Sequence, residues 1–203
     1  RWRVRAGAEA GDFEVLHAVR LGGFGSTAMV AERAMAAVPT VEAILERLAS
    51  QGLVEFMDFA GSGGWTLTDP GRDHDAELHA AEMADPGLRR VVDEAAAGFE
   101  RINPRMVRAV TDWQLATAAE KNEVRTRTIA ELDDLYTELD ELIMRVVPVA
   151  PRYRRYPRQF GAAVARARKG DDDAIASVGT LSCHTVWAEL HQDLVSGLGR
   201  ERR

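Results

Sequence analysis

Apolar residues recur with helical spacing in residues 26–38, which predicts a short helix there. Ser26 is a suitable N-cap, because its hydroxyl can accept a hydrogen bond from an otherwise unpaired backbone amide. Pro39 is expected to end this helix, since proline disfavours helical geometry in the residue before it. The predicted buried face consists of Val30, Ala31, Ala34, Met35 and Val38.

A second helix is predicted from Thr40 to Gln51, with apolar residues at i, i+3, i+4 and i+7. It should end at Gly52, because glycine readily adopts the left-handed conformation that commonly terminates a helix. Two half-buried strands are expected in the alternating segments 53–57 and 65–68, joined by a mobile reversal in the GSGG run at 61–64. The buried residues of the helix are predicted to be Val41, Ile44, Leu45 and Leu48.

The order helix, turn, helix and two-stranded wing predicts a winged helix-turn-helix. Residues 12–83 resemble that domain of MarR-type transcriptional regulators, and the run LTDPGR at 67–72 is similar to the family's "LTxxGR" exit from the wing into a long helix. The resemblance implies that the helix from Thr40 enters the DNA major groove and that the wing contacts the DNA backbone. MarR wings usually carry basic residues, and this tip has none.

The resemblance also implies which residues would bind DNA. Glu42 and Glu46 could face only exocyclic amino groups such as cytosine N4. Phosphate contacts would have to come from Arg1, Arg3, Arg5, Arg33 or the basic segment 152–169. The candidate DNA-binding residues are Ser26, Thr27, Thr40, Glu42, Ala43, Arg47, Ser62 and Gly63.

The charge distribution opposes DNA binding by this segment. The chain has a formal net charge of −6, and residues 40–69 contain Arg47 as their single base against five acids. Nucleic-acid-binding modules gather Lys and Arg on the binding face, because neutralising phosphates supplies much of the affinity. A protein-interaction module without DNA binding is therefore the alternative to a DNA-binding regulator.

The helices that flank the winged segment contain three candidate polar residues. Residues 12–21 are expected to form the first helix, with His17 turned inward as a core or boundary histidine. After the wing, Asp69 is expected to cap a helix running to about residue 83. Asp75 and His79 lie at i, i+4, but two ligands do not make a metal site, so a solvated helix face is expected.

Residues 84–203 are predicted to form an all-helical dimerisation and effector domain. Helices are expected at 88–102, 105–116, 123–147 and 181–198, with Pro104 ending the first. The segment 123–147 is expected to be the longest helix, and its apolar stripe is either a core seam or a dimer seam, with the core favoured. The segment 152–169 contains seven basic and three aromatic residues and no acid. It either contacts a ligand or DNA, or forms a basic face that pairs with the acidic helix at 131–141.

The last helix supplies candidate ligand-binding residues for a small, acidic effector. His184 and His191 are separated by about 10 Å along the helix, too far to share one metal ion unaided. Side chains from two helices either converge at the edge of a polar pocket or form an aromatic core with hydrogen-bonded histidines. The candidate residues are Asp112, Trp113, Arg155, His184, Trp187 and His191.

Composition and motifs favour a cytoplasmic, non-enzymatic protein. The single cysteine, Cys183, is typical of a reducing compartment and is expected to be a buried, inert thiol. No Gly-rich phosphate loop, GxSxG elbow or HExxH motif occurs, so no cofactor or metal is predicted. The stretches LHAVRL, TDWQ and ELHQDL are similar to helical proteins or tails associated in actinomycetes with pyruvate-phosphate-dikinase-like enzymes, which implies an accessory module linked to a phosphotransfer enzyme. The sequence predicts a dimeric, effector-responsive regulator or such an accessory module.

Overall fold

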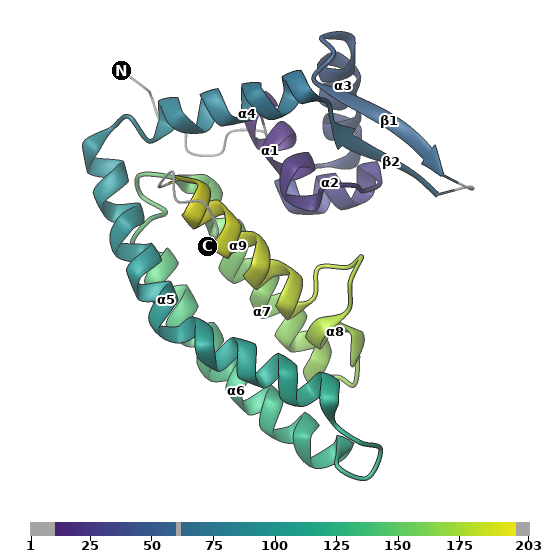
Figure 1. Cartoon of the computed structure of the whole chain (residues 1–203), viewed down its shortest axis with the longest axis vertical. Coiled ribbons are helices and arrows are strands. Elements are labelled where there is room, and N and C mark those ends of the chain that lie inside the picture. Colours follow the sequence, from purple (N-terminus) through teal and green to yellow (C-terminus); the bar gives the residue numbers. More distant parts are fainter. Residues whose placement is uncertain (1–10, 60–61, 198–203) are drawn as a thin grey trace. The chain divides into compact units, whose positions relative to one another are not determined.

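The computed structural model describes residues 11–59 and 62–197 (Figure 1). These residues form a mainly helical fold with one two-stranded antiparallel sheet, so the predicted mainly α class is confirmed. The chain divides into two compact units, of which the first ends at Glu82 and the second begins at Met83. Each unit has a hydrophobic core of its own. No helix in the described ranges is both long and apolar enough to cross a membrane.

The N-terminal unit encloses its core between four helices and a hairpin. Its elements are α1 (Asp12–Gly22), α2 (Thr27–Ala34), α3 (Val38–Ser50), β1 (Val54–Phe59), β2 (Ser62–Leu67) and α4 (Asp69–Glu82). The four apolar residues predicted for the inner face of α3 are all buried, as expected. Ser26 caps α2 by accepting a 3.3 Å hydrogen bond from the Met29 amide, and Gly52 follows α3 with a φ of 72°, so both predictions are confirmed.

The predicted boundary between α2 and α3 is wrong. α2 ends at Ala34, and Met35 adopts a left-handed conformation with φ 51° and ψ 41°. Pro39 lies in the first turn of α3 instead of ending α2. The first turn of a helix tolerates proline because its missing amide proton would have no partner there. As a result Met35 and Val38, predicted to be buried, are 41% and 44% exposed.

The hairpin is longer than predicted. Ser62, Gly63 and Gly64, expected in a mobile reversal, belong to β2, and Asp58 pairs with Gly63. The two glycines make room for aromatic rings: a Cβ on Gly63 would collide with Phe56, and one on Gly64 with Phe24. Cross-strand pairing therefore places these glycines in a strand, and the neighbouring rings occupy the space of a Cβ.

The start of α4 also differs in one detail. Thr68 caps the helix in place of Asp69, because the Thr68 hydroxyl accepts a 3.1 Å hydrogen bond from the Gly71 amide. Gly71 packs directly against the carbonyl of Leu53, and a Cβ at this position would collide with that oxygen. Glycine is thus required here for close packing of α4 against the chain that leads into β1.

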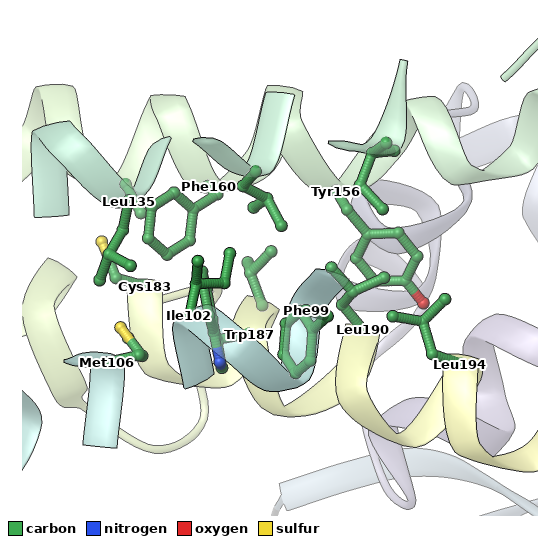
Figure 2. Close-up of a cluster of buried hydrophobic side chains, with 14 of the residues drawn as sticks. Phe99, Ile102, Met106, Leu135, Tyr156, Phe160, Cys183, Trp187, Leu190 and Leu194 are labelled. Atoms are coloured by element: carbon green, nitrogen blue, oxygen red, sulfur yellow. The ribbon is translucent and has the colours of Figure 1, made fainter. Parts of the chain in front are cut away.

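The C-terminal unit is a helical bundle around an aromatic core. Its elements are α5 (Pro86–Leu115), α6 (Lys121–Ile143), η1 (Pro151–Arg154), α7 (Arg155–Arg168), α8 (Asp173–Ala176) and α9 (Cys183–Gly197). The ring of Trp187 lies 4.7 Å from that of Phe99 and 5.5 Å from that of Phe160, measured between centroids (Figure 2). The apolar stripe of α6 lies in this core, which confirms the core interpretation of that stripe.

Residues 86–115 form one helix of 30 residues, so the prediction that Pro104 separates two helices is wrong. Apolar residues before and after the proline share one buried face, including Phe99, Ile102, Met106 and Val110. Packing of this face outweighs the hydrogen bond that proline removes. α5, and not the segment 123–147, is therefore the longest of the described helices.

Candidate functional site

The outward face of α3 carries the largest group of predicted site residues that are accessible in the structure. Glu42, Ala43, Glu46 and Arg47 are exposed, and Thr40 is half-buried. Their positions follow from the helical period, which places them opposite the buried residues of α3. The outward face thus carries two free-standing acids, one methyl group and one base.

That base is engaged within the unit. Arg47 donates to both carboxylate oxygens of Asp12 at the start of α1, with 3.3 Å from Nε to Oδ2. The hydrogen bond to Asp12 and the charge of its carboxylate raise the pKa of the guanidinium. Arg47 therefore presents a neutralised ion pair, rather than a free cation, to any partner.

The other arginines of the described N-terminal unit are also engaged or buried. Arg33, proposed as a phosphate contact, is 4% exposed and packs beside Gly22, so that prediction is wrong. Arg20 pairs with buried Asp75, with 3.2 Å from Nε to Oδ2, and Arg72 pairs with Asp69. The predicted contacts Arg1, Arg3 and Arg5 lie outside the described residues.

The remaining predicted DNA contacts hold the unit together. Ser26 caps α2, and the Thr27 hydroxyl accepts a 3.0 Å hydrogen bond from the Trp65 indole. Ser62 and Gly63 belong to β2, where Gly63 lies beneath the Phe56 ring. The Thr27–Trp65 hydrogen bond anchors the hairpin to α2, whereas the contacts of Ser26 and Gly63 lie within α2 and within the hairpin.

An apolar, exposed run joins α2 to α3. Met35, Ala37, Val38 and Pro39 are exposed, and Ala36 is half-buried. Five consecutive apolar residues at a surface turn are uncommon in a soluble domain unless they bind something. Sequence periodicity missed this run, because it assigned Met35 and Val38 to the core.

A buried polar cluster joins α1 to α4. His17 Nδ1 lies 3.1 Å from Asp75 Oδ1, and the His17 and His79 rings are 5.5 Å apart. His17 is thus a core histidine, as predicted, whereas the predicted solvated face at Asp75 and His79 is wrong, since both are buried. Within residues 11–59 and 62–197, no group of three or more His, Cys, Asp or Glu side chains could hold a metal ion.

A second buried polar cluster joins η1 and α7 to α9 in the C-terminal unit. Arg152 Nη1 lies 2.5 Å from Asp193 Oδ2, and the Tyr156 hydroxyl donates to the same oxygen at 2.7 Å. Arg155 Nη2 lies 3.3 Å from Glu189 Oε2 and 2.7 Å from the Tyr156 hydroxyl. Two arginines therefore face two carboxylates, and the cluster is balanced in charge.

The pKa values in this cluster follow from burial and charge. Burial raises the pKa of Tyr156 well above its ordinary value, and the Asp193 charge adds to this rise against the opposing effect of Arg155. Burial alone would lower the pKa of Arg155, but its interactions with Tyr156 and Glu189 reverse this effect and raise it. The phenol therefore stays protonated and the guanidinium charged.

Some arginines of the basic segment 152–169 form ion pairs with α9, which the sequence did not predict. Another pairs with the acidic helix α6, as one of the two interpretations of the segment predicted. Arg168 pairs with Asp133 of α6 at 2.6 Å, whereas Arg152 and Arg155 pair with α9. Arg154, Arg158 and Lys169 are exposed. Only the exposed members of the segment are accessible to a ligand.

The predicted ligand-binding residues lie in different surroundings. Asp112 and His184 are exposed, and Trp113 is buried beneath Lys121, whose Nζ lies 3.3 Å from the ring centroid. Trp187 is in the core, where its indole donates to Asn103 Oδ1 at 3.0 Å. Trp187 therefore belongs to the aromatic core, the second of the two arrangements predicted for these residues. Effector binding stays a prediction.

Two further predicted residues have structural surroundings. His191 Nε2 lies 2.9 Å from Glu100 Oε1 on α5, so this histidine is paired at the surface of the bundle. Cys183 is fully buried, and burial raises the pKa of its thiol to about 12, in accord with the expected inert thiol.

The fold and these sites define a mainly helical protein of two compact units, the first of which presents an acidic and apolar face. Comparison with protein-family models, with curated proteins and with solved structures finds no match for the chain.

Proposed function

We propose that the N-terminal unit is a winged helix-turn-helix used as a protein-interaction module, and that the chain is a regulatory or accessory protein that acts through a protein partner. The order α2, turn, α3 and antiparallel hairpin supports the winged-helix interpretation. Exposure of one whole side of α3 supports its use as a binding surface.

The charge of this unit is the observation that carries the proposal. Its described residues contain four arginines, no lysine and twelve Asp and Glu, a formal net charge of −8. Arg47 and Arg72 are paired with carboxylates, and Arg33 is buried. A DNA-binding face gains most of its affinity by placing free cations against phosphates, and this face offers acids in their place.

The first test measures DNA binding by the purified chain. Fluorescence anisotropy with labelled random duplexes of about 30 base pairs is expected to show no binding even near 50 mM salt, where phosphate contacts are favoured. Binding at that salt concentration that weakens steeply as salt is raised would contradict the proposal.

The second test identifies what α3 touches. A photo-crosslinking amino acid in place of exposed Ala43 is expected to form adducts that protease destroys and nuclease leaves intact. The same amino acid in place of Val107, which is 57% exposed on α5, is the matched control and should not form those adducts. Nuclease-sensitive adducts at Ala43 would support DNA binding instead.

A second candidate is the DNA-binding regulator predicted from the resemblance, and one observation favours it. Arg154 and Arg158 are exposed four positions apart where η1 leads into α7, Lys169 is exposed at the C-terminal end of α7, and these bases could contact phosphates. If DNA binding is found, Arg154→Ala with Arg158→Ala should weaken it for all sequences alike. If the chain is such a regulator, we expect it to form a homodimer and to bind a small effector.

A further inference from the structure

Met35 combines an unfavourable backbone conformation with an exposed side chain. Its φ of 51° is the one positive φ at a residue other than glycine among the described residues. Left-handed geometry is rare for a bulky side chain, and the turn of a helix-turn-helix often contains glycine. The Ala36 amide closes the end of α2 on the Ala31 carbonyl at 3.0 Å, a backbone contact that glycine or asparagine at position 35 would equally permit.

Core packing of the Met35 side chain does not offset the free-energy cost of its left-handed backbone conformation. It is 41% exposed and lies outside the buried cluster of the unit. Strain that the fold does not need is a reason to look for function. The methionine side chain is itself suited to contact with a partner, because it is flexible and polarisable.

The neighbouring residues extend the apolar surface. Ala37, Val38 and Pro39 follow Met35 directly and are exposed, and Ala43 lies one helical turn beyond Pro39 on α3. All of these residues lie within nine consecutive positions of the chain, across the turn and the first two turns of α3. We call Met35, Ala37, Val38, Pro39 and Ala43 the turn patch.

Acidic residues flank the turn patch. Glu42 and Glu46 are exposed on α3, one position before and three positions after Ala43. Arg47 also lies on this side of α3, but its charge is matched by Asp12, so the local charge stays negative. The patch is therefore apolar with an anionic border.

We propose that the turn patch binds a segment of a protein partner that places an apolar side chain on Met35 and Val38 and Lys or Arg side chains on Glu42 and Glu46. This inference rests on the proposed protein-interaction function and names its site and the chemistry of the partner. Apolar contact supplies affinity, and the charges supply orientation and selectivity.

The same border disfavours other occupants. A second copy bound through the same patch would form an isologous contact and bring the two acidic borders toward each other. Phosphates of DNA and the headgroups of an anionic membrane would meet the same repulsion. A cationic protein segment is the occupant that the charges favour.

The test uses the full chain and peptides selected on it from a random 12-residue display library. Met35→Asn removes the apolar side chain and suits the left-handed conformation, and Val38→Ser removes an apolar side chain without changing charge. Glu42→Gln with Glu46→Gln removes the anionic border. Matched controls are Val178→Ser, at a residue 93% exposed, and Glu141→Gln on exposed α6 surface.

Selected peptides are expected to combine Lys or Arg with an apolar residue. Their affinity should fall at least tenfold in Met35→Asn, in Val38→Ser and in the double glutamine variant, and stay within twofold in both controls. The melting temperature of Met35→Asn should not fall, because the strain is relieved. A fall in affinity without a loss of stability separates binding from folding.

Several outcomes would overturn the inference. If the selected peptides bind all of these variants equally, or lose affinity only in Phe56→Ser, the binding site lies outside the turn patch. The proposed protein-interaction function would then still stand. A homodimer in size-exclusion chromatography that Val38→Ser dissociates would make a second copy the occupant. Salt-dependent DNA binding would overturn both this inference and the function on which it rests.

Discussion

The pair between Arg155 and Glu189 gives the sharpest stability prediction, because both of its charges are buried. Nη2 and Oε2 are 3.3 Å apart, and the side chains are 8% and 5% exposed. At an effective dielectric constant of about 20, unit charges at this distance attract by about 5 kcal/mol. Desolvation of the two ions costs several kcal/mol each and offsets most of that attraction. The pair as a whole should contribute little, whereas removing one of two mutually compensating buried charges should be costly.

Arg155→Met leaves Glu189 buried without this partner and also removes a hydrogen bond to Tyr156. It is expected to lower the free energy of unfolding by about 3–5 kcal/mol. The double variant Arg155→Met with Glu189→Met removes both charges and should regain most of that loss, because apolar side chains of similar length suit the site.

Urea unfolding followed by circular dichroism at 222 nm measures these differences at pH 7. Arg105→Met is the control: its pairs with Glu131 and Glu138 lie at the surface, with side chains 34–44% exposed, and its effect should stay below about 1 kcal/mol. A double variant that is as destabilised as Arg155→Met, or more so, would refute the reasoning, since the charges would then not be compensating each other.

Three further predictions concern single groups. Cys183, with its pKa raised to about 12 by burial, should not react with iodoacetamide at pH 8 in the folded chain and should react once urea unfolds it. Tyr156 has a raised pKa, so the folded state keeps its phenolic proton to higher pH than the unfolded state does. The free energy of unfolding, measured as a function of pH, should therefore be unaffected by this group below about pH 10 and fall above it. Tyr156→Phe should make that fall smaller. Gly71→Ala would force a methyl group against the Leu53 carbonyl and should cost about 3 kcal/mol in thermal unfolding. A Cβ at Gly98 would clash with the end of the flexible Leu142 side chain instead of with backbone, so Gly98→Ala should cost less than about 1.5 kcal/mol.

Local patterns in the sequence were sufficient wherever the deciding interaction spans one helical turn. The buried face of α3, the cap at Ser26 and the left-handed Gly52 all depend on residues within a few positions, and each was predicted correctly. The acidity of the region around α3 also follows from composition alone.

Only the tertiary structure could decide the features that depend on distant partners. The α5 helix continues through Pro104 because its apolar face packs on both sides of the proline. Gly64 lies in a strand because it pairs with Met57, and the Phe24 ring, forty positions earlier, occupies the place where a Cβ would be. Arg47 is paired with Asp12 and Arg155 with Glu189, 35 and 34 positions apart. Such contacts leave no periodic trace in the sequence, since ion pairing and ring packing depend on where the fold brings side chains and not on their spacing along the chain.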